Sequence, residues 1–193
     1  MELEGFKESK LCFASTVSTN VFARMKKKTL YEALGTKRYS KLKDKYVDEY
    51  QSNLNQPIGD FLLSLKKQRD ENYKDFLNAY GDLTYCKFKL ADKSFLEARG
   101  IYAFKLNGKL KYIGRCRNTF KSRVNMGYGN ISPRNCYLDG QATNCHINHL
   151  IYETGSQVTF HVYPLESESE IIEREIELIT DFQPDWNIAL KSH

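Results

Sequence analysis

The stretch GIYAFKLNGKLKYIGR, residues 100–115, decides the fold of this chain. Two short runs of strand character, 100–106 and 109–115, flank Leu106-Asn107-Gly108. An Asn-Gly step between two such runs is a strong signal for a β-hairpin. The sequence therefore predicts two antiparallel strands joined by a tight turn.

The register of this hairpin decides whether its two motif tyrosines can cooperate. A two-residue turn would place Tyr102 and Tyr112 on opposite faces, whereas a three-residue loop with Gly108 in the left-handed conformation sets them directly opposite each other. The second register also pairs Phe104 with Leu110, apolar with apolar. We expect the three-residue loop, and with it two phenols on one face.

The rest of the chain predicts a mixed α+β protein. Residues 99–193 are expected to form a small domain, a three-stranded sheet flanked by helices, and residues 1–98 a mainly helical basic region for DNA recognition or dimerisation. The boundary follows the change of pattern near residues 91–99. The expected elements are a strand at 84–90, helices at 120–126 and 143–154, a strand at 157–163 and a helix at 167–182.

Basic clusters and tyrosines alternate in the N-terminal region. The clusters lie at 24–28, 37–45 and 66–69. Tyr39 and Tyr46 stand among them and could contact DNA, but tyrosines seven residues apart more often share the core face of a helix. The spacing favours the core.

Charge is unevenly distributed, although the net charge is only +5. Residues 99–134 hold nine Lys or Arg and no Asp or Glu, hence +9, while residues 135–193 hold two basic and ten acidic residues, hence −8. Such an excess of positive charge suits a surface that meets phosphates. A solubilising face balanced by an acidic helix is the alternative, and charge alone leaves it open.

Several protein classes are excluded. No apolar run is long enough to span a membrane, and MELEGFKESK lacks the pattern of a signal peptide. Five cysteines at irregular spacings argue against a disulfide framework. We expect reduced thiols in a cytoplasmic protein with no membrane partner.

One glutamate stands out in the predicted helix at 167–182. The apolar stripe of this helix comprises Ile171, Ile172, Leu178, Ile179 and Phe182, and Glu175 falls in its middle. A carboxylate on a buried face needs a cation or a proton. An ion pair with an arginine or lysine and a metal or catalytic role both remain open.

Taken together, these motifs resemble the signature of GIY-YIG nucleases. Gly100-Ile101-Tyr102 and Tyr112-Ile113-Gly114-Arg115 stand at the family's spacing. The later run from Glu173 to Ile188, with Glu175 in a helix and Asn187 on the departing chain, is similar to the family's closing motif. The resemblance covers about half of the chain.

The resemblance implies a role for each matching residue. Tyr102 would activate the attacking water, and Tyr112 would position water or phosphate. Glu175 would hold the metal, and Asn187 would support the site by hydrogen bonding. Gly114 belongs to the second motif.

Two arginines could assist this chemistry. A neutral phenol, with a pKa of about 10, is a poor base. Arg115 and Arg123 could favour phenolate character and neutralise the phosphate in the transition state. For Arg115, and more so for Arg117, plain surface charge is the alternative.

The sequence departs from the family pattern around Arg123. This arginine lies one residue further from Gly114 than in simpler family members. The histidine or tyrosine often found one helical turn later would be Gly127, so the neighbouring Tyr128 could replace it.

The resemblance implies a hydrolase that cuts double-stranded DNA and leaves 5′-phosphate and 3′-hydroxyl ends. One protein carboxylate with water and phosphate ligands suits Mg²⁺, with Mn²⁺ as a possible substitute. The order of domains resembles restriction endonucleases of the family, which act as homodimers. A mobile-element or repair nuclease is the first alternative, and a catalytically silent DNA-binding module the second.

Four cysteines and histidines near the middle of the chain raise the question of a zinc site. Cys136, Cys145, His146 and His149 fit no common zinc spacing, so we do not expect zinc. Cys116 could be a reactive thiol, but packing is the favoured interpretation.

Overall fold

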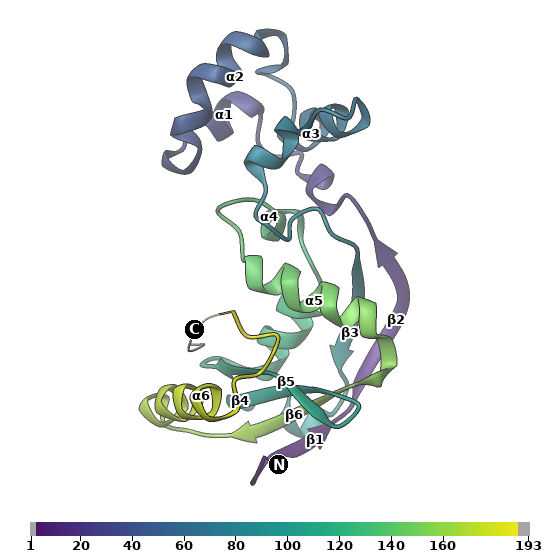
Figure 1. Cartoon of the computed structure of the whole chain (residues 1–193), viewed down its shortest axis with the longest axis vertical. Helices are drawn as coiled ribbons and strands as arrows, with labels where there is room; N and C mark the ends of the chain where they lie inside the picture. Colours follow the sequence, from purple (N-terminus) through teal and green to yellow (C-terminus); the bar gives the residue numbers. More distant parts are fainter. Residues whose placement is uncertain (1–2, 189–193) are drawn as a thin grey trace. The chain divides into compact units, whose positions relative to one another are not determined.

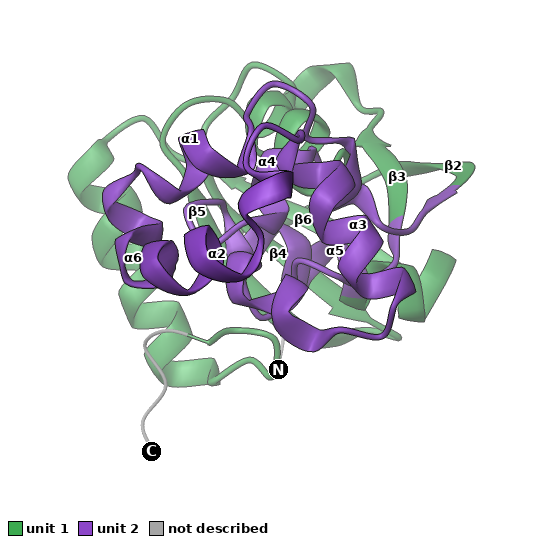
Figure 2. Ribbon diagram, turned by 90° about the horizontal axis from the view of Figure 1, so that it is seen from above, with its two compact units in different colours: residues 1–16, 86–130, 150–193 green, residues 17–85, 131–149 purple. Residues whose placement is uncertain are grey.

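The computed structural model of the chain describes residues 3–188 (Figure 1). Contacts divide the chain into two units, which Figure 2 shows in different colours. Unit 1 comprises Met1–Thr16, Cys86–Asn130 and Leu150–His193, and unit 2 comprises Val17–Tyr85 and Ile131–His149. These units do not coincide with the ranges 1–98 and 99–193, whose separate roles stay predictions.

Unit 1 is built on an antiparallel sheet with the strand order β1-β6-β4-β5. The expected sheet had three strands. The fourth is β1, a short run of charged and polar residues that carries no apolar alternation and was therefore missed. The strands are β1 (Lys7–Ser9), β4 (Gly100–Leu106), β5 (Lys109–Cys116) and β6 (Val158–Pro164).

Further elements belong to unit 1 or continue from one unit into the other. Strands β2 and β3 form a separate two-stranded sheet. The expected helix at 120–126 is a π-helix, η6. These elements are β2 (Leu11–Ser18), β3 (Tyr85–Leu90), η5 (Lys93–Phe95), η6 (Lys121–Tyr128), α5 (Ala142–Thr154), η7 (Gly155–Gln157) and α6 (Glu168–Phe182).

The hairpin between β4 and β5 has a register that the sequence did not predict. Asn107 and Gly108 both have positive φ, 50° and 77°, and form a two-residue turn in place of the expected three-residue loop. A bulge then shifts the pairing, so that Tyr102 lies opposite Gly114 and Phe104 opposite Tyr112. The shift returns both motif tyrosines to one face of the sheet, as expected, but in diagonal positions.

The bulge is stabilised by the C-terminal segment. Lys111 is the residue of β5 that the pairing skips. Its carbonyl accepts the Trp186 backbone N–H at 2.8 Å, and its ammonium pairs with Asp185. A contact distant in sequence therefore fixes the register of the motif strand.

Helix α6 packs on one face of the sheet through its apolar stripe. Ile171, Leu178 and Ile179 are buried with Ile101 and Ile113, which point to the face opposite the tyrosines. Ser167 caps the helix by accepting the Glu170 N–H, and Gln183 ends it with a φ of 44°. The glutamates that lie off this stripe, Glu168, Glu170, Glu173 and Glu177, are exposed.

Unit 2 is mainly helical and also takes in residues 131–149. The N-terminal region 1–98, expected to be mainly helical, is only partly so, because residues 7–9 and 11–18 form strands β1 and β2. Backbone hydrogen bonds connect the two stretches, from the Asn78 N–H to Cys136 and from the Leu138 N–H to Phe76. Its elements are η1 (Val21–Arg24), α1 (Leu30–Leu34), η2 (Lys37–Leu42), α2 (Lys43–Glu49), η3 (Gln51–Asn53), α3 (Ile58–Lys67), η4 (Glu71–Phe76), α4 (Pro133–Cys136) and the start of α5.

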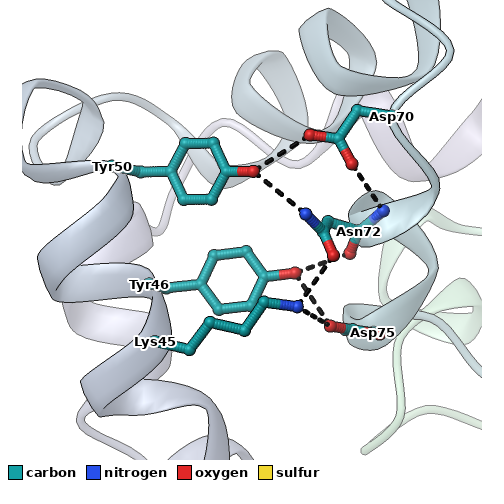
Figure 3. Close-up of polar contacts among 6 residues, drawn as sticks. All are labelled: Lys45, Tyr46, Tyr50, Asp70, Asn72 and Asp75. Carbon is teal, nitrogen blue, oxygen red and sulfur yellow. Dashed lines mark hydrogen bonds and ion pairs between the residues drawn. The ribbon is translucent and has the colours of Figure 1, made fainter.

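The tyrosines of unit 2 lie in its core, as predicted. Tyr39 and Tyr46 are 3% and 0% exposed. Figure 3 shows how the end of α2 is tied to η4: Tyr46 donates to Asp75 at 3.0 Å, and Tyr50 donates to Asp70 at 2.9 Å. Burial, reinforced by the Asp75 carboxylate, raises the pKa of Tyr46, so its phenol stays neutral.

No helix between residues 3 and 188 combines the length and the apolar character needed to cross a membrane.

Candidate active site

The motif glycines make room for the polar groups of the hairpin. Gly114 lies opposite Tyr102, and a Cβ on Gly114 would come within 2.5 Å of the Tyr102 hydroxyl oxygen and 2.8 Å of Tyr112 Cε1. Gly100 has a φ of 140°, and a Cβ there would meet the backbone at the end of β6. Both positions therefore require glycine for steric reasons.

Three tyrosines and an arginine form a buried hydrogen-bonded network. The Tyr128 hydroxyl lies 2.8 Å from that of Tyr102 and 3.1 Å from that of Tyr112. Arg123 Nε donates to the Tyr102 hydroxyl oxygen at 3.0 Å. Tyr102 and Tyr128 are 0% exposed and Tyr112 is 7% exposed, so among the three Tyr112 is the tyrosine nearest to solvent.

The π-helix η6 explains why Tyr128 and not Gly127 completes this network. In a π-helix the backbone hydrogen bonds join residues five apart, and the Gly129 N–H donates to the Val124 carbonyl at 2.7 Å. The same spacing brings Tyr128 beside Arg123, whose guanidinium carbon lies 5.0 Å from the centre of the Tyr128 ring. An α-helix would have brought Gly127 to this position.

Burial keeps the phenols of Tyr102 and Tyr128 neutral. The pKa of Tyr102 is raised, chiefly by burial and also by Tyr112, although Arg123 lowers it. Burial likewise raises the pKa of Tyr128 well above its ordinary value. Arg123 thus favours the phenolate of Tyr102, as expected, but desolvation outweighs this effect and the phenol stays neutral.

Arg123 remains protonated and keeps hydrogen-bonding capacity. The adjacent tyrosines, Tyr102 first, raise its pKa further. Its Nε–H is used by Tyr102, while its two terminal nitrogens donate to none of residues 3–188. The guanidinium thus retains N–H groups for an anionic ligand.

Glu175 is paired with Arg115. Arg115 Nη1 lies 2.7 Å from Glu175 Oε2, and the glutamate side chain is only 13% exposed. Burial raises the pKa of Glu175, whereas the charges of Arg115 and then Arg123 lower it. The ion-pair alternative is therefore real in this structure, and Arg123 acts on the same carboxyl group.

The tyrosine network and the Arg115–Glu175 pair lie on opposite faces of the edge strand β5. Side chains alternate along a strand, so Tyr112 points to the face of the tyrosine network, whereas Ile113 and Arg115 point to the face that α6 covers. A single strand separates the tyrosine network from the Arg115–Glu175 pair. Arg117, two residues after the motif, is exposed and pairs with Glu168, which fits the surface-charge alternative.

Asn187 completes the open edge of β5. Its Nδ2 donates to the Ile113 carbonyl at 2.8 Å, and its Oδ1 accepts the Ile113 N–H at 2.9 Å. Both residues are buried. The amide therefore replaces a missing strand partner, which agrees with the supporting role expected from the motif.

Replacing Asn187 by alanine is expected to destabilise the protein by about 2 kcal/mol or more, because it leaves the buried N–H and C=O of Ile113 without partners. The midpoint of urea unfolding measures the effect. Asp185→Asn is the matched control, since its carboxylate is 70% exposed and contributes little through its ion pair. Equal shifts for the two variants would contradict the bridging role of Asn187.

The side chains near Glu175 suit a hydrated divalent cation better than a closed metal site. Glu175 Oε2 accepts a hydrogen bond from Arg115 Nη1, and the Arg115 backbone also interacts with the carboxyl group. No group of three or more His, Cys, Asp or Glu in the described part of the chain could hold a metal. A cation here would have one protein ligand and keep its water or phosphate ligands, as Mg²⁺ does.

The cysteines and histidines of α4 and α5 have other surroundings. His146 lies against Tyr80, with ring centroids 4.4 Å apart, and His149 Nδ1 is 3.0 Å from the Thr84 carbonyl. Cys136 is buried beside the Tyr85 hydroxyl. Cys116 is also buried, and burial raises the pKa of its thiol, which fits a packing role.

No protein-family model matches the chain, and neither the curated proteins nor the solved structures include a match. Any assignment of function therefore rests on the motif residues and on the geometry that unites them.

Proposed function

We propose that the chain is a metal-dependent endonuclease of the GIY-YIG type that hydrolyses phosphodiester bonds of double-stranded DNA. The observation that carries the proposal is the network in which Tyr128 joins the hydroxyls of both motif tyrosines while Arg123 donates to Tyr102. Residues distant in sequence and matching one nuclease signature share a single hydrogen-bonded cluster.

The groups at the site suit the hydrolysis of a phosphodiester. A water oxygen bonds to phosphorus, the bond from phosphorus to O3′ breaks, and a proton passes to the departing oxygen, which leaves 5′-phosphate and 3′-hydroxyl ends. The unused N–H groups of Arg123 neutralise the charge that develops on the phosphate. Mg²⁺ or Mn²⁺, when held by Glu175, supplies Lewis-acid stabilisation and a more acidic water.

Tyr102 and Tyr128 handle protons as neutral phenols. Arg123 donates to the Tyr102 oxygen, so the Tyr102 proton is free to point toward Tyr128, and Tyr128 can in turn donate to Tyr112. In this direction the Tyr112 hydroxyl, the least buried of the three, offers its proton outward. Tyr112 would then orient the attacking water or a phosphate oxygen, and Tyr102 would act through the network.

The biological setting proposed is a site-specific defence nuclease of the restriction type that acts in the cytoplasm. One site cuts one strand, so a double-strand break calls for two copies and hence a homodimer. A mobile-element or repair nuclease is the alternative setting. The excess of positive charge in residues 99–134 supports contact with DNA in each case.

Digestion of a supercoiled plasmid tests the proposal. Incubation with Mg²⁺, or with EDTA as the control, is followed by gel analysis and by mapping of the ends. Discrete fragments with 5′-phosphates would support a restriction-type enzyme, and a smear a nuclease without site preference. Intact plasmid together with tight DNA binding would contradict catalysis and favour the silent binding module.

Replacing Tyr128 by phenylalanine is expected to slow cleavage by about tenfold to a hundredfold, because it removes the hydroxyl that joins the other two tyrosines but keeps the ring. Single-turnover rates with excess enzyme measure the effect. Tyr163→Phe is the matched control, since this partly buried residue of β6 stacks on Phe6 outside the network. Equal rates for wild type and Tyr128→Phe would contradict the relay.

A further inference from the structure

Unit 2 contains a pocket of about 430 Å³ that the proposed nuclease site does not use. Its apolar lining includes Tyr39, Tyr137 and Ile58, which are 3%, 4% and 1% exposed. The hydroxyls of both tyrosines are already engaged, Tyr39 with Asp139 at 3.1 Å and Tyr137 with the Phe22 carbonyl at 3.1 Å. The volume lies within the range of roughly 300–1,000 Å³ typical of small-molecule sites.

Three cations line the same pocket: Lys27, Lys28 and Arg134. All three are exposed, and none forms an ion pair within residues 3–188, although the neighbouring Lys26 pairs with Asp60. The backbone of Lys28 is fixed, because its carbonyl accepts the Ile58 N–H at 2.9 Å. The pocket therefore combines unneutralised positive charge with an apolar and aromatic lining.

Asp139 is the single acidic residue of the lining. Three cations and one carboxylate give the pocket a formal charge of +3 − 1 = +2. Tyr39 donates to one oxygen of this carboxylate, and its other oxygen remains an acceptor. A ligand that fills the site should therefore carry about two negative charges, as a phosphate monoester does, together with a flat ring and an N–H donor.

We propose that this pocket binds one nucleotide. Its phosphate would contact Lys27, Lys28 and Arg134, its base would lie against the tyrosine rings, and Asp139 would accept from a base N–H. An inorganic anion would leave the aromatic lining unused, and an apolar molecule would leave three cations unneutralised. A nucleotide has all of the complementary parts.

The nucleotide could come from two sources with the same chemistry. A free mononucleotide carries its charge on one phosphate. A nucleotide unstacked from a DNA strand carries it on the two flanking phosphates, and this second source rests on the proposed nuclease function. The experiment separates the two.

Calorimetric titration of the full chain in EDTA tests the pocket without cleavage. The ligands are the four deoxynucleoside monophosphates, the corresponding nucleosides, inorganic phosphate, and a short oligonucleotide in single-stranded and duplex form. At least one monophosphate or oligonucleotide should bind more tightly than the nucleosides and phosphate. Saturation-transfer NMR should show transfer from the protein to base protons, which gives a second readout.

Paired variants locate the binding. Lys27→Gln combined with Arg134→Gln should weaken it about tenfold or more, because two charge-assisted contacts are lost. Lys41→Gln combined with Lys43→Gln removes the same charge from exposed lysines of η2 and α2 and should change it little. Asp139→Asn should alter the preference among the four bases.

The outcomes are distinct. Binding of monophosphates would assign the free nucleotide, and binding of oligonucleotides alone, sensitive to the pocket variants, would assign a nucleotide in a strand. Equal loss in the pocket and control variants, or no binding by any nucleotide, would overturn the proposal. Plasmid cleavage in Mg²⁺ is scored separately, so failure of the pocket and failure of the nuclease cannot be confused.

Discussion

Glu175→Gln is expected to lower Mg²⁺-dependent DNA cleavage by at least about a thousandfold, because it removes the carboxylate proposed to hold the cation. Binding to duplex DNA in EDTA should persist, since the substitution removes a negative charge near the phosphate. The measurements are single-turnover cleavage and fluorescence anisotropy of a labelled duplex. Glu173→Gln, an exposed residue on the same helix, is the matched control. Retained turnover in Glu175→Gln would contradict the assignment.

The same variant should be at least as stable as the wild type at neutral pH. Burial raises the pKa of Glu175 above its ordinary value of 4.5 in spite of Arg115 and Arg123. A raised carboxyl pKa means that the folded state favours the protonated form, so stability from this group is present at low pH and is lost as pH rises through the folded pKa. Glutamine resembles the protonated form at all pH values. A melting temperature well below that of the wild type would show instead that the ion pair dominates.

The raised pKa of Glu175 should also appear in the pH dependence of DNA cleavage. The proposed metal ligand is the ionised carboxylate, so activity should fall as pH decreases, with an inflection above 4.5. Arg123 stays charged across this range, so it does not contribute to the fall in activity.

The hairpin shows how far the sequence predicts the site. Asn107-Gly108 correctly located the turn, because both residues tolerate the positive φ that a two-residue turn needs. The predicted pairing was wrong, since it assumed a regular ladder. The bulge at Lys111 depends on the backbone N–H of Trp186, which is distant in sequence and invisible to local patterning. The tyrosines share a face because of that distant contact.

Two other differences also have a physical origin. Strand β1 pairs only with β6 at the edge of the sheet, and its first two residues are exposed, so no apolar pattern marks it. The π-helix moves the position that follows Arg123 by one residue, from Gly127 to Tyr128. The extra residue before Arg123 was visible in the sequence, but the hydrogen-bond pattern that accommodates it was not.

The predicted helix stripe, by contrast, was sufficient to find Glu175. Ile171, Leu178 and Ile179 are buried as the helical period requires, and the carboxylate between them has found the cation it needs in Arg115. Helical periodicity is a local property, whereas the choice of partner depends on the fold. The sequence could therefore identify the residue but could not choose between an ion pair and a metal.

Arg123→Gln should reduce cleavage by about a hundredfold to a thousandfold or more, because the guanidinium has two tasks at the proposed site. Its Nε–H donates to Tyr102 and so sets the direction of the hydrogen bonds that begin there, and its unused N–H groups would neutralise charge on the phosphate proposed to bind. A neutral amide supplies no charge and has fewer donors. Single-turnover rates measure the loss, and Lys121→Gln, an exposed cation of the same helix paired with Glu97, is the matched control.

Arg123→Lys separates charge from geometry. Lysine keeps the positive charge but lacks the planar fork that can serve the Tyr102 oxygen and a phosphate at once. We therefore expect it to recover less than about a tenth of the activity lost in Arg123→Gln. Full recovery would mean that only the charge matters and that the hydrogen bond to Tyr102 is structural. Partial recovery would tie the proposed catalysis to the network of Tyr102, Tyr112 and Tyr128.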